Sequence, residues 1–403
     1  MASIAIVGGG PGGSAFALWA LRAGVAPGDL VILDKAAFPR PKLCGGALTF
    51  RGTETLRELL GQPGGGGETR GLEFRCALGS FPVRERDVQW LYDRALLDDT
   101  LLQACVDAGV EVRERCQVTG VEPTSSGWRV EWKGLAGRQH EGFDWVVGAD
   151  GARGVVRRAA GLRGGIVGRL VEAVYEPVEA GRWDPTTLYF DFDPILDGIP
   201  GYGWIFPYPK PGATGLWKLG VMDGRGVASG SALKAWTEAY AARSGFRRVD
   251  EKIAGWPEHY WSPKTEAHRP GLILTGEAWG IDPLLGEGIA PALEISRYAA
   301  GRLKEALDAG TPTIPGYERG FRKTPEGRNL KFQWRLAEML YGPQAYRWLR
   351  VLFGHAYMKQ LAAAGTEAYG RLAQHVFKLA RSYAWQVLRE GFPSNAPIER
   401  DAA

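Results

Sequence analysis

The chain has 403 residues, 45% of them hydrophobic and 23% charged, with a formal net charge of +4. This length exceeds what a single hydrophobic core usually spans, so two or three folded units are expected. The small net charge, and the lack of any basic run interleaved with aromatic residues, argues against a nucleic-acid-binding protein.

The N-terminal segment predicts a dinucleotide-binding turn. An apolar strand over residues 4–7 leads into Gly8, Gly10 and Gly13, spaced G-x-G-x-x-G before a helix. Gly8 permits a tight turn, Gly10 lets a pyrophosphate touch the backbone, and Gly13 lets the helix pack on the strand. The next apolar strand ends in Asp34, about twenty residues on, where a carboxylate binds a ribose hydroxyl. The alternative is a glycine-rich loop in an unrelated α/β protein.

The rest of the chain alternates between helices and strands, and its periodicity and turn residues give approximate boundaries. Helices are expected over residues 53–60, 93–108 and 232–242, and through most of the chain after residue 288. Strands are expected over 111–121, 128–132 and 143–147, and through most of 170–261, with a hairpin turn at 125–127 and loops at 38–46 and 64–67. The aromatic C-terminal helices suggest core packing or a subunit contact, with a lipid tunnel or a membrane surface as the alternative.

A second anion-binding turn is predicted near the end of the sheet. An apolar strand over residues 272–274 runs into a Gly/Pro-rich turn with Gly286 and Gly288, followed by a helix. A free helix N-terminus after such a turn presents several N–H groups and the positive end of the helix dipole. Two such turns far apart in one chain suggest a large, two-ended cofactor. Flavin adenine dinucleotide (FAD) fits, because its pyrophosphate needs one turn and the anionic edge of reduced flavin the other.

Cysteine and histidine usage predicts no metal site and a reducing compartment. The four cysteines show no C-x-x-C pairing, and the five histidines form no H-x-x-x-H pair. With no signal peptide and no apolar stretch long enough to span a bilayer, a cytoplasmic protein is expected, with peripheral membrane contact as an option.

Four spaced motifs resemble the FAD-dependent group that includes aromatic hydroxylases, flavin-dependent halogenases and geranylgeranyl reductases. The resemblance covers about the first three hundred residues. Beside the glycine turn with Asp34, it rests on an R-x-x-x-D helix beginning at Arg94, a D-G motif at Asp150, and the run from Gly276 to Ile289. In relatives that run begins G-D, and its aspartate binds the flavin ribityl chain; here Glu277 takes that place, and Trp279 replaces a usually small residue.

Two further segments are closer to the geranylgeranyl reductase branch. A loop that includes Lys42 and Cys44 resembles that branch's K-x-C-G-G, and Tyr202-Gly-Trp-Ile-Phe-Pro207 resembles its Y-x-W-x-F-P motif. Halogenases carry W-x-W-x-I-P in a similar place, which this chain does not match. The resemblance implies an α/β fold (α+β overall): a Rossmann-like FAD-binding domain of the aromatic-hydroxylase type, an antiparallel-sheet substrate domain and a C-terminal helical region. The FAD-binding domain is expected to comprise residues 1–60, 91–165 and 265–310. The substrate domain is expected to comprise residues 61–90 and 166–264, and the C-terminal helical region residues 311–403.

The chemistry of an isolated alkene indicates what the substrate site needs. Such an alkene accepts hydride poorly unless it is protonated, so an acid, a dry pocket and electron-rich rings are required. Tyr202, Trp204 and Phe206 alternate on a strand and therefore point to one face, either toward the flavin or into an ordinary core. Cys44 is the candidate acid or tuning thiol; the alternative is a small buried hydrophobe. Lys42 and Arg40 are either surface cations or contacts to a substrate pyrophosphate.

We therefore expect an FAD-dependent oxidoreductase that reduces C=C bonds of a prenyl or similar hydrophobic substrate. The alternatives are a flavin monooxygenase or halogenase acting on an aromatic substrate, and a non-catalytic FAD-binding protein. The reductant is expected to be NADPH, NADH or an external electron-donor protein. The candidate catalytic residues are Cys44, Tyr202, Trp204 and Phe206. The candidate cofactor-binding residues are Gly8, Gly10, Pro11, Gly13, Asp34, Lys35, Cys44, Gly45, Arg94, Val118, Asp150, Gly151, Glu277, Asp282, Pro283, Gly286, Gly288 and Ile289.

Overall fold

A computed structural model describes residues 3–61, 66–210, 212, 215–354 and 393–398 of the chain. A six-stranded sheet carries the N-terminal strand and has the order β17-β18-β10-β1-β2-β6, parallel except for β17. Its strands are β1 (Ile4–Val7), β2 (Leu30–Leu33), β6 (Glu111–Arg113), β10 (Trp145–Gly148), β17 (His268–Arg269) and β18 (Leu272–Leu274). All four residues of β1 are buried, as expected for a parallel strand covered on both faces.

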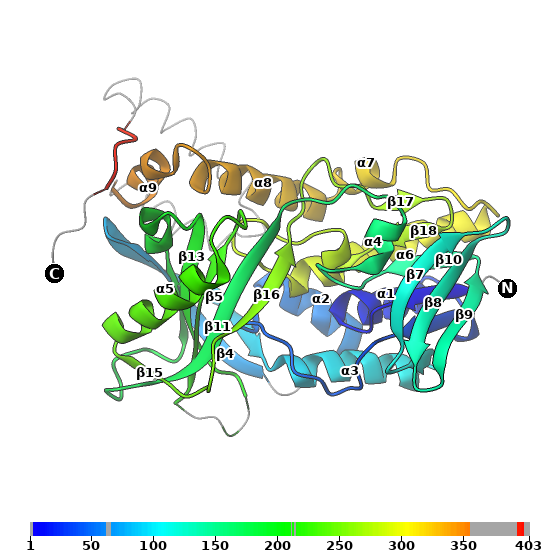
Figure 1. Ribbon diagram of the computed structural model, residues 1–403, viewed down its shortest axis with the longest axis horizontal. Coiled ribbons are helices and arrows are strands. Elements are labelled where there is room, and N and C mark those ends of the chain that lie inside the picture. Colours follow the sequence, from blue (N-terminus) through cyan, green and yellow to red (C-terminus); the bar gives the residue numbers. More distant parts are fainter. Residues whose placement is uncertain (1–2, 62–65, 211, 213–214, 355–392, 399–403) are drawn as a thin grey trace.

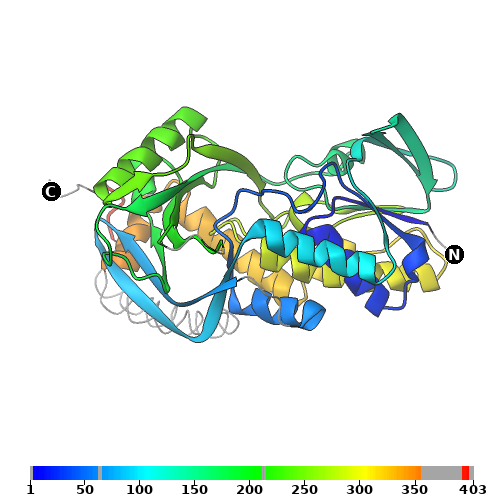
Figure 2. The same ribbon diagram turned by 90° about the horizontal axis from the view of Figure 1, so that it is seen from below.

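Helices cover one side of this sheet and a small antiparallel sheet covers the other (Figure 2). The helices are α1 (Pro11–Arg22), α3 (Arg94–Asp107) and α6 (Ile289–Asp308), with α2 (Phe50–Leu60) packed on α6. The small sheet has strands β7 (Gln117–Pro123), β8 (Trp128–Gly134) and β9 (Gly137–Phe143), and α4 (Val155–Ala159) contacts β7. The helix expected over residues 53–60 lies within α2, and the one expected over 93–108 is α3.

A nine-stranded sheet forms the other half of the molecule (Figure 1). Its main order is β15-β11-β14-β13-β12-β4-β5-β3, and β16 also pairs with β11. The strands are β3 (Ala47–Leu48), β4 (Gly66–Cys76), β5 (Gly79–Tyr92), β11 (Val167–Pro177), β12 (Thr187–Asp191), β13 (Gly201–Pro207), β14 (Trp217–Asp223), β15 (Phe246–Arg248) and β16 (Ala254–His259). Most neighbouring strands run antiparallel, while β4 and β12 are parallel.

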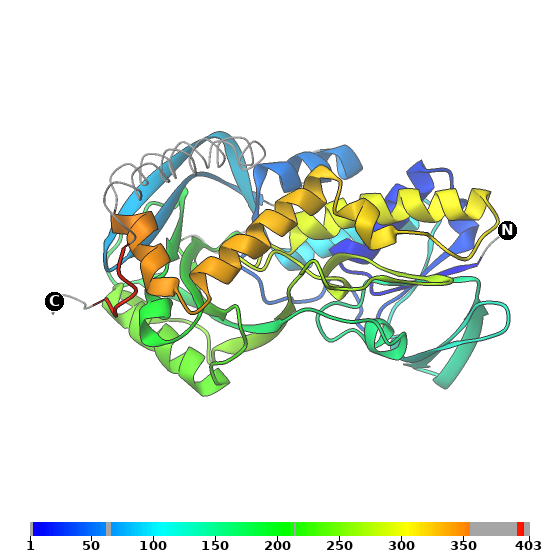
Figure 3. The ribbon, with the colours of Figure 1, turned by 90° about the horizontal axis from the view of Figure 1, so that it is seen from above.

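The two faces of the nine-stranded sheet have different neighbours. One face packs on α5 (Gly230–Arg243), the helix expected over residues 232–242. The other face contributes an apolar cluster with residues of α8 (Pro325–Leu340) and α9 (Ala345–Gly354), which includes Tyr341 and Phe353. Figure 3 shows α8 running from α7 (Tyr317–Phe321) toward α9 beside this sheet. The short 3-10 turns are η1 (Pro27–Asp29), η2 (Asp193–Asp197) and η3 (Gly276–Ala278).

The fold class predicted from the sequence is confirmed, but two local predictions are wrong. The strand expected over residues 111–121 is two strands, β6 and β7, in different sheets. Arg115 between them has a positive φ of 55°, which ends β6 without any glycine or proline to signal the turn. Of the loop expected over 64–67, residues 64 and 65 lie outside the described residues, and Gly66 instead starts β4, paired with Tyr92 of β5. The proposed domain division stays a prediction.

Candidate active site

A cavity of about 770 Å³ contains most of the sequence-predicted site residues. It opens at the carboxyl ends of β1, β2 and β10, where ligands bind in open α/β sheets, and extends to the nine-stranded sheet. Gly13 and Pro283 do not line it. The predicted residues that do are Gly8, Gly10, Pro11, Asp34, Lys35, Cys44, Gly45, Arg94, Val118, Asp150, Gly151, Tyr202, Trp204, Phe206, Glu277, Asp282, Gly286, Gly288 and Ile289.

The glycine turn after β1 is shaped by close backbone approaches. Gly8 has a φ of +106°, and a Cβ there would lie 2.5 Å from the Ala149 carbonyl oxygen. A Cβ on Gly13 would lie 1.8 Å from the Gly8 oxygen, so Gly13 is needed for packing of α1 on the turn. A Cβ on Gly10 would meet only Arg40, at 3.1 Å, on the cavity side. Gly10 caps α1 without a side-chain hydrogen bond, so N–H groups at this helix end are open to an anion.

Two carboxylates follow the neighbouring strands. Asp34, after β2, accepts the Gly9 amide at 2.7 Å and the Ala36 amide at 2.8 Å. Asp150, after β10, accepts the Val156 amide at 3.0 Å through Oδ2. Its Oδ1 is buried and has no hydrogen-bond partner among the described residues. A buried acceptor at a cavity wall needs a donor, and a dinucleotide hydroxyl or a water supplies one.

The two predicted anion-binding turns lie against each other. A Cβ on Gly12 would be 3.4 Å from the Gly276 Cα, so the start of α1 contacts η3. A buried chain of hydrogen bonds ties them together: Thr275 and Ser296 hydroxyls are 2.7 Å apart, and Ser296 donates to the Gly12 carbonyl at 2.7 Å. Segments separated by more than 250 positions in the sequence therefore form one rigid wall of the cavity.

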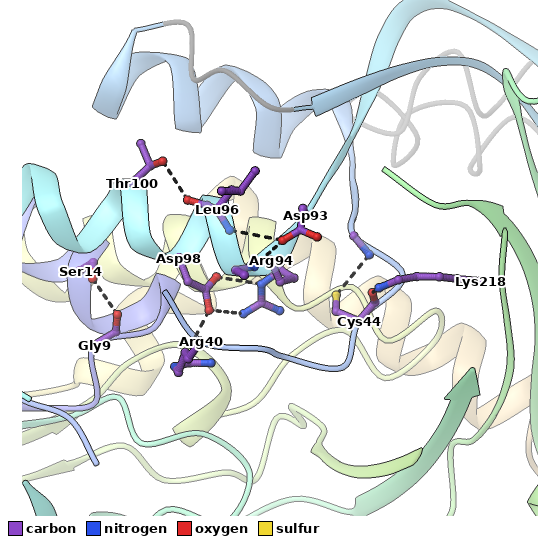
Figure 4. Close-up of polar contacts among 12 residues, drawn as sticks. Gly9, Ser14, Arg40, Cys44, Asp93, Arg94, Leu96, Asp98, Thr100 and Lys218 are labelled. Atoms are coloured by element: carbon purple, nitrogen blue, oxygen red, sulfur yellow. Dashed lines mark hydrogen bonds and ion pairs between the residues drawn. The ribbon is translucent and has the colours of Figure 1, made fainter. Parts of the chain in front are cut away.

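Arg94 is held rigidly beside the predicted pyrophosphate site (Figure 4). It forms a bidentate pair with Asp98, with N–O distances of 2.8 and 3.0 Å, and Arg40 reaches the same carboxylate at 3.3 Å. Burial disfavours the charged form of Arg94, but the contributions of neighbouring groups, with Asp98 the largest of them, together outweigh it and raise the Arg94 pKa. Arg94 is only 9% exposed and lines the cavity, so it is not the solvated surface cation that an isolated helical arginine usually is.

The loop that carries Cys44 is fixed between the two sheets. The Gly46 amide donates to the Cys44 sulfur at 3.4 Å. Lys218 of β14 donates to the Cys44 carbonyl at 2.5 Å (Figure 4). A Cβ on Gly45 would lie 2.7 Å from the Phe206 ring, so only glycine allows this loop to lie on the aromatic strand.

Lys218 belongs to a buried ion pair that also reaches Trp204. Its ammonium is 3.4 Å from Glu172 of β11, and the Trp204 indole donates to the same carboxylate at 3.3 Å. Lys218 and Glu172 are 8% and 2% exposed. One pair of charges therefore orients both the Cys44 loop and the central ring of the predicted aromatic face.

The aromatic face of β13 forms the apolar wall of the cavity. The Tyr202 and Trp204 rings are 5.9 Å apart, and those of Trp204 and Phe206 are 6.4 Å apart. The prediction that all three point to one face is confirmed, because they share one core cluster and line one cavity. The opposite face of β13 packs on α5 through Ile205. The two interpretations of these rings are thus compatible, since they are buried and also border the cavity.

The turn before α6 is stabilised by its own buried acids. Asp282 accepts the Leu284 and Leu285 amides at 2.7 and 3.1 Å, and burial raises its pKa to about 7. The Tyr202 hydroxyl donates to the Leu285 carbonyl at 2.5 Å. Gly288 caps α6 without a side-chain hydrogen bond, so this helix also presents a free N-terminus to the cavity. Pro283 is buried within the turn and lies off the cavity wall.

The two residues that depart from the family pattern, Glu277 and Trp279, lie in different surroundings. Glu277 lines the cavity, and a Cβ on Gly151 would be 3.4 Å from its carboxylate, so its longer side chain extends to the D-G motif. Burial raises the Glu277 pKa, while Lys42 and Arg94 oppose this. Trp279 is 1% exposed and stacks on Tyr317 at 5.2 Å, away from the cavity lining. The tryptophan therefore extends the core and leaves the cofactor side clear.

The sequence did not point to Glu258, and it predicted for Lys42 only a surface cation or a contact to a substrate pyrophosphate. The Lys42 ammonium lies 3.8 Å from the Trp256 ring centroid, and burial lowers its pKa to about 8 despite the neighbouring Glu277. Glu258, on β16, is buried in the cavity wall and accepts the Tyr260 hydroxyl at 2.7 Å. The sequence carries no signal for this burial, which appears only in the structure, where all residues from Pro257 to Trp261 are buried.

Comparison with known proteins places the chain in a family. No family model matches it. It is 30% identical over 352 residues to a menaquinone reductase of Mycolicibacterium smegmatis, covering 79% of this chain and 82% of that protein. It is 26% identical over 361 residues to digeranylgeranylglycerophospholipid reductase 2 of Methanothermobacter thermautotrophicus, covering 84% and 88%. The chain belongs to the geranylgeranyl reductase branch of the FAD-dependent oxidoreductases, and it is a flavin-dependent reductase.

Solved structures show the same fold. A geranylgeranyl bacteriochlorophyll reductase-like protein from Thermoplasma acidophilum superposes with a TM-score of 0.76 at 20% identity, covering 96% of this chain and 98% of that one. A variant of the halogenase PltM in complex with FAD has a TM-score of 0.69 at 13% identity, covering 97% and 93%. These likenesses, with the glycine turn and the uncapped helix ends, support FAD as the cofactor. Among the described helices, none is both long and apolar enough to cross a membrane.

Proposed function

We propose that this enzyme adds hydrogen across an isolated carbon–carbon double bond in a prenyl chain. The observation that carries the proposal is that one cavity joins an FAD-type cradle to an apolar aromatic wall. The cradle lies at the carboxyl ends of the parallel strands, and the wall is the Tyr202 face of β13. The sequence relatives, named as reductases of a menaquinone and of a prenylated lipid, support this substrate class.

The residues that we assign to FAD fall into three groups along the cavity. The turn from Gly8 to Pro11 and the start of α1 bind the pyrophosphate, with Arg94 nearby as a fixed cation. Asp34, Lys35 and Val118 border the adenosine end. At the other end, the D-G motif, Glu277 and the turn before α6 hold the ribityl chain and the flavin. The cavity-lining residues of this group are Asp150, Gly151, Glu277, Asp282, Gly286, Gly288 and Ile289. Gly13 and Pro283 act through packing.

Bound FAD, once reduced, supplies hydride. The chain's own residues supply the conditions that an unactivated alkene needs. Tyr202, Trp204 and Phe206 exclude water and present ring faces that stabilise positive charge developing on the substrate. Burial keeps the Tyr202 pKa well above its ordinary value, so this side chain stays a neutral phenol held by the Leu285 carbonyl. Cys44 and Gly45 form the facing loop.

The source of electrons and the cellular location are further parts of the proposal. We propose NADPH, NADH or a separate electron-donor protein as reductant. Anaerobic bleaching of the flavin by NADPH or NADH alone would favour the nicotinamides. We also propose a cytoplasmic enzyme that meets its prenyl substrate at a membrane surface. Flotation of the protein with phospholipid vesicles containing a prenylated quinone tests this contact, and protein left entirely in the dense fraction would count against it.

The experiment that tests the function uses FAD-loaded protein reduced photochemically, so the natural electron donor is not needed. The reduced enzyme is mixed anaerobically with geranylgeranyl diphosphate or a menaquinone, and products are identified by mass spectrometry. The proposal predicts products heavier by pairs of hydrogen atoms without oxygen. Products that form only with oxygen would instead indicate the monooxygenase or halogenase alternative.

A further inference from the structure

Glu258 lies where three segments of the cavity meet. It sits near the end of β16, and a Cβ on Gly286 would be 3.2 Å from its Oε2 and 3.1 Å from the Met222 sulfur. Met222 is the ladder partner of Tyr202, so the aromatic wall borders the same point. Lys42, from the Cys44 loop, also acts electrostatically on this carboxyl. The flavin-side turn, the aromatic wall and the Cys44 loop therefore converge on one acid.

The carboxyl of Glu258 is only partly engaged. The Tyr260 hydroxyl donates to Oε2 at 2.7 Å, and no other hydrogen bond to this side chain occurs among the described residues. The residue is 7% exposed and lines the cavity. Its remaining oxygen is thus available to a molecule in the cavity. The Cys44 sulfur, by contrast, already accepts the Gly46 amide at 3.4 Å.

We propose that Glu258 is the proton donor in the alkene reduction, an inference that rests on the proposed function. The π bond of the alkene breaks. The Glu258 carboxyl proton forms one new C–H bond, and hydride from reduced flavin forms the other. The alkene is reduced by two electrons, the flavin leaves oxidised, and the Glu258 carboxylate is reprotonated from water.

The electrostatic surroundings keep the Glu258 carboxyl protonated near neutral pH. Burial raises the Glu258 pKa to about 8, and the neighbouring Glu277 and Asp282 act in the same direction. Lys42 and the Tyr260 hydroxyl oppose this increase without cancelling it. The phenols of Tyr202 and Tyr260 have pKa values raised further above their ordinary value, so they do not compete as donors.

Three variants test the proposal: Glu258→Gln, Glu258→Asp and the matched control Glu294→Gln. Gln keeps the shape of the carboxyl and an acceptor for Tyr260 but has no acidic proton. Asp keeps an acidic proton on a side chain that is shorter by one methylene. It provides the test if Glu258→Gln does not fold. Glu294, on α6, is also buried with a pKa raised to about 7, but it pairs with Arg51 and lies off the cavity.

The first readout does not depend on turnover. Infrared difference spectra of the FAD-loaded protein across pH should show a carboxylic C=O band that titrates near pH 8. Asp282, Glu287 and Glu294 are also buried acids with pKa values raised to about 7, so the test compares each variant with wild type. The component that titrates near pH 8 should be lost from Glu258→Gln and kept in Glu294→Gln, which should instead lose a component near pH 7. A Glu258→Gln spectrum that matches wild type across this pH range would overturn the assignment.

The second readout is flavin reoxidation after the chemically reduced enzyme is mixed anaerobically with geranylgeranyl diphosphate. General acid catalysis contributes roughly 100- to 10,000-fold, so Glu258→Gln should react at least about 100-fold more slowly with unchanged FAD content and probe binding. Glu258→Asp should lie between Gln and wild type, and Glu294→Gln should match wild type. A wild-type rate in Glu258→Gln would remove the proton-donor role alone. No hydrogenated product from wild type would remove the proposed function and this role with it.

Discussion

Replacing Lys218 with methionine should destabilise the protein strongly, because it leaves a buried charge without its partner. Lys218 and Glu172 are almost inaccessible, and their charged atoms are 3.4 Å apart. Removing one member of a buried ion pair typically costs about 3–5 kcal/mol. The Cys44 carbonyl also loses its Lys218 donor. We therefore expect Lys218→Met to lower the free energy of unfolding by about 3–5 kcal/mol and to loosen the Cys44 loop.

Urea unfolding of the FAD-loaded protein, followed by tryptophan fluorescence, measures this loss. The double variant Lys218→Met/Glu172→Leu should recover most of it, because replacing both members of a buried pair with apolar residues is often neutral. Burial opposes the charge on Lys218, but the contributions of neighbouring groups, with Glu172 the largest of them, together outweigh it and raise the Lys218 pKa above 10.5. The stabilisation is therefore fully present below about pH 10.5 and is lost as the pH rises through the folded-state pKa.

Two results would refute this reasoning. A loss below about 1 kcal/mol in Lys218→Met would mean that the pair behaves like an exposed salt bridge. A double variant as unstable as the single variant would show that the Cys44 carbonyl contact or local packing, rather than the unpaired Glu172, sets the cost.

Three further predictions concern cofactor, substrate and pH. Gly10→Glu should abolish FAD retention, since its side chain would enter the cavity beside the pyrophosphate site; flavin absorbance after gel filtration checks this, and normal content would contradict it. Trp204→Leu should lower turnover more than Trp204→Phe, with equal FAD content, in anaerobic product assays; equal rates would assign the ring to packing alone. Because the Glu258 pKa is raised by folding, its contribution to stability is present below about pH 4.5 and is lost as the pH rises toward 8. Glu258→Gln should therefore flatten the pH dependence of the thermal unfolding temperature. Identical pH profiles for the variant and wild type would count against this.

Local patterns in the sequence predicted the parts of the site that depend on neighbours along the chain. The G-x-G-x-x-G turn needs only a strand, three glycines and a helix, and the structure has this order at Gly8 to Gly13. The shared face of Tyr202, Trp204 and Phe206 follows from the two-residue period of a strand, and it is confirmed. Their contact with a cavity could not be predicted, because it depends on which segment packs opposite.

The missed features depend on contacts between distant segments. The break at Arg115 has no glycine or proline, and it is held by hydrogen bonds from Arg115 and Cys116 amides to carbonyls after β2. The Lys218 ion pair joins two strands to a loop more than 170 positions away. Glu258 looks like an ordinary surface glutamate in the sequence, and its burial results from β16 packing against the turn at Gly286. The burial of Trp279 likewise could not be predicted, because it depends on α7 packing beside this side chain.

The central claim is that the enzyme hydrogenates a double bond and does not oxygenate its substrate. The most direct test is mass spectrometry of products from photoreduced, FAD-loaded enzyme mixed with geranylgeranyl diphosphate, in parallel with and without oxygen. We expect products carrying two or more added hydrogens in the anaerobic sample. Products that appear only with oxygen, carrying an added oxygen atom or halogen, would contradict it.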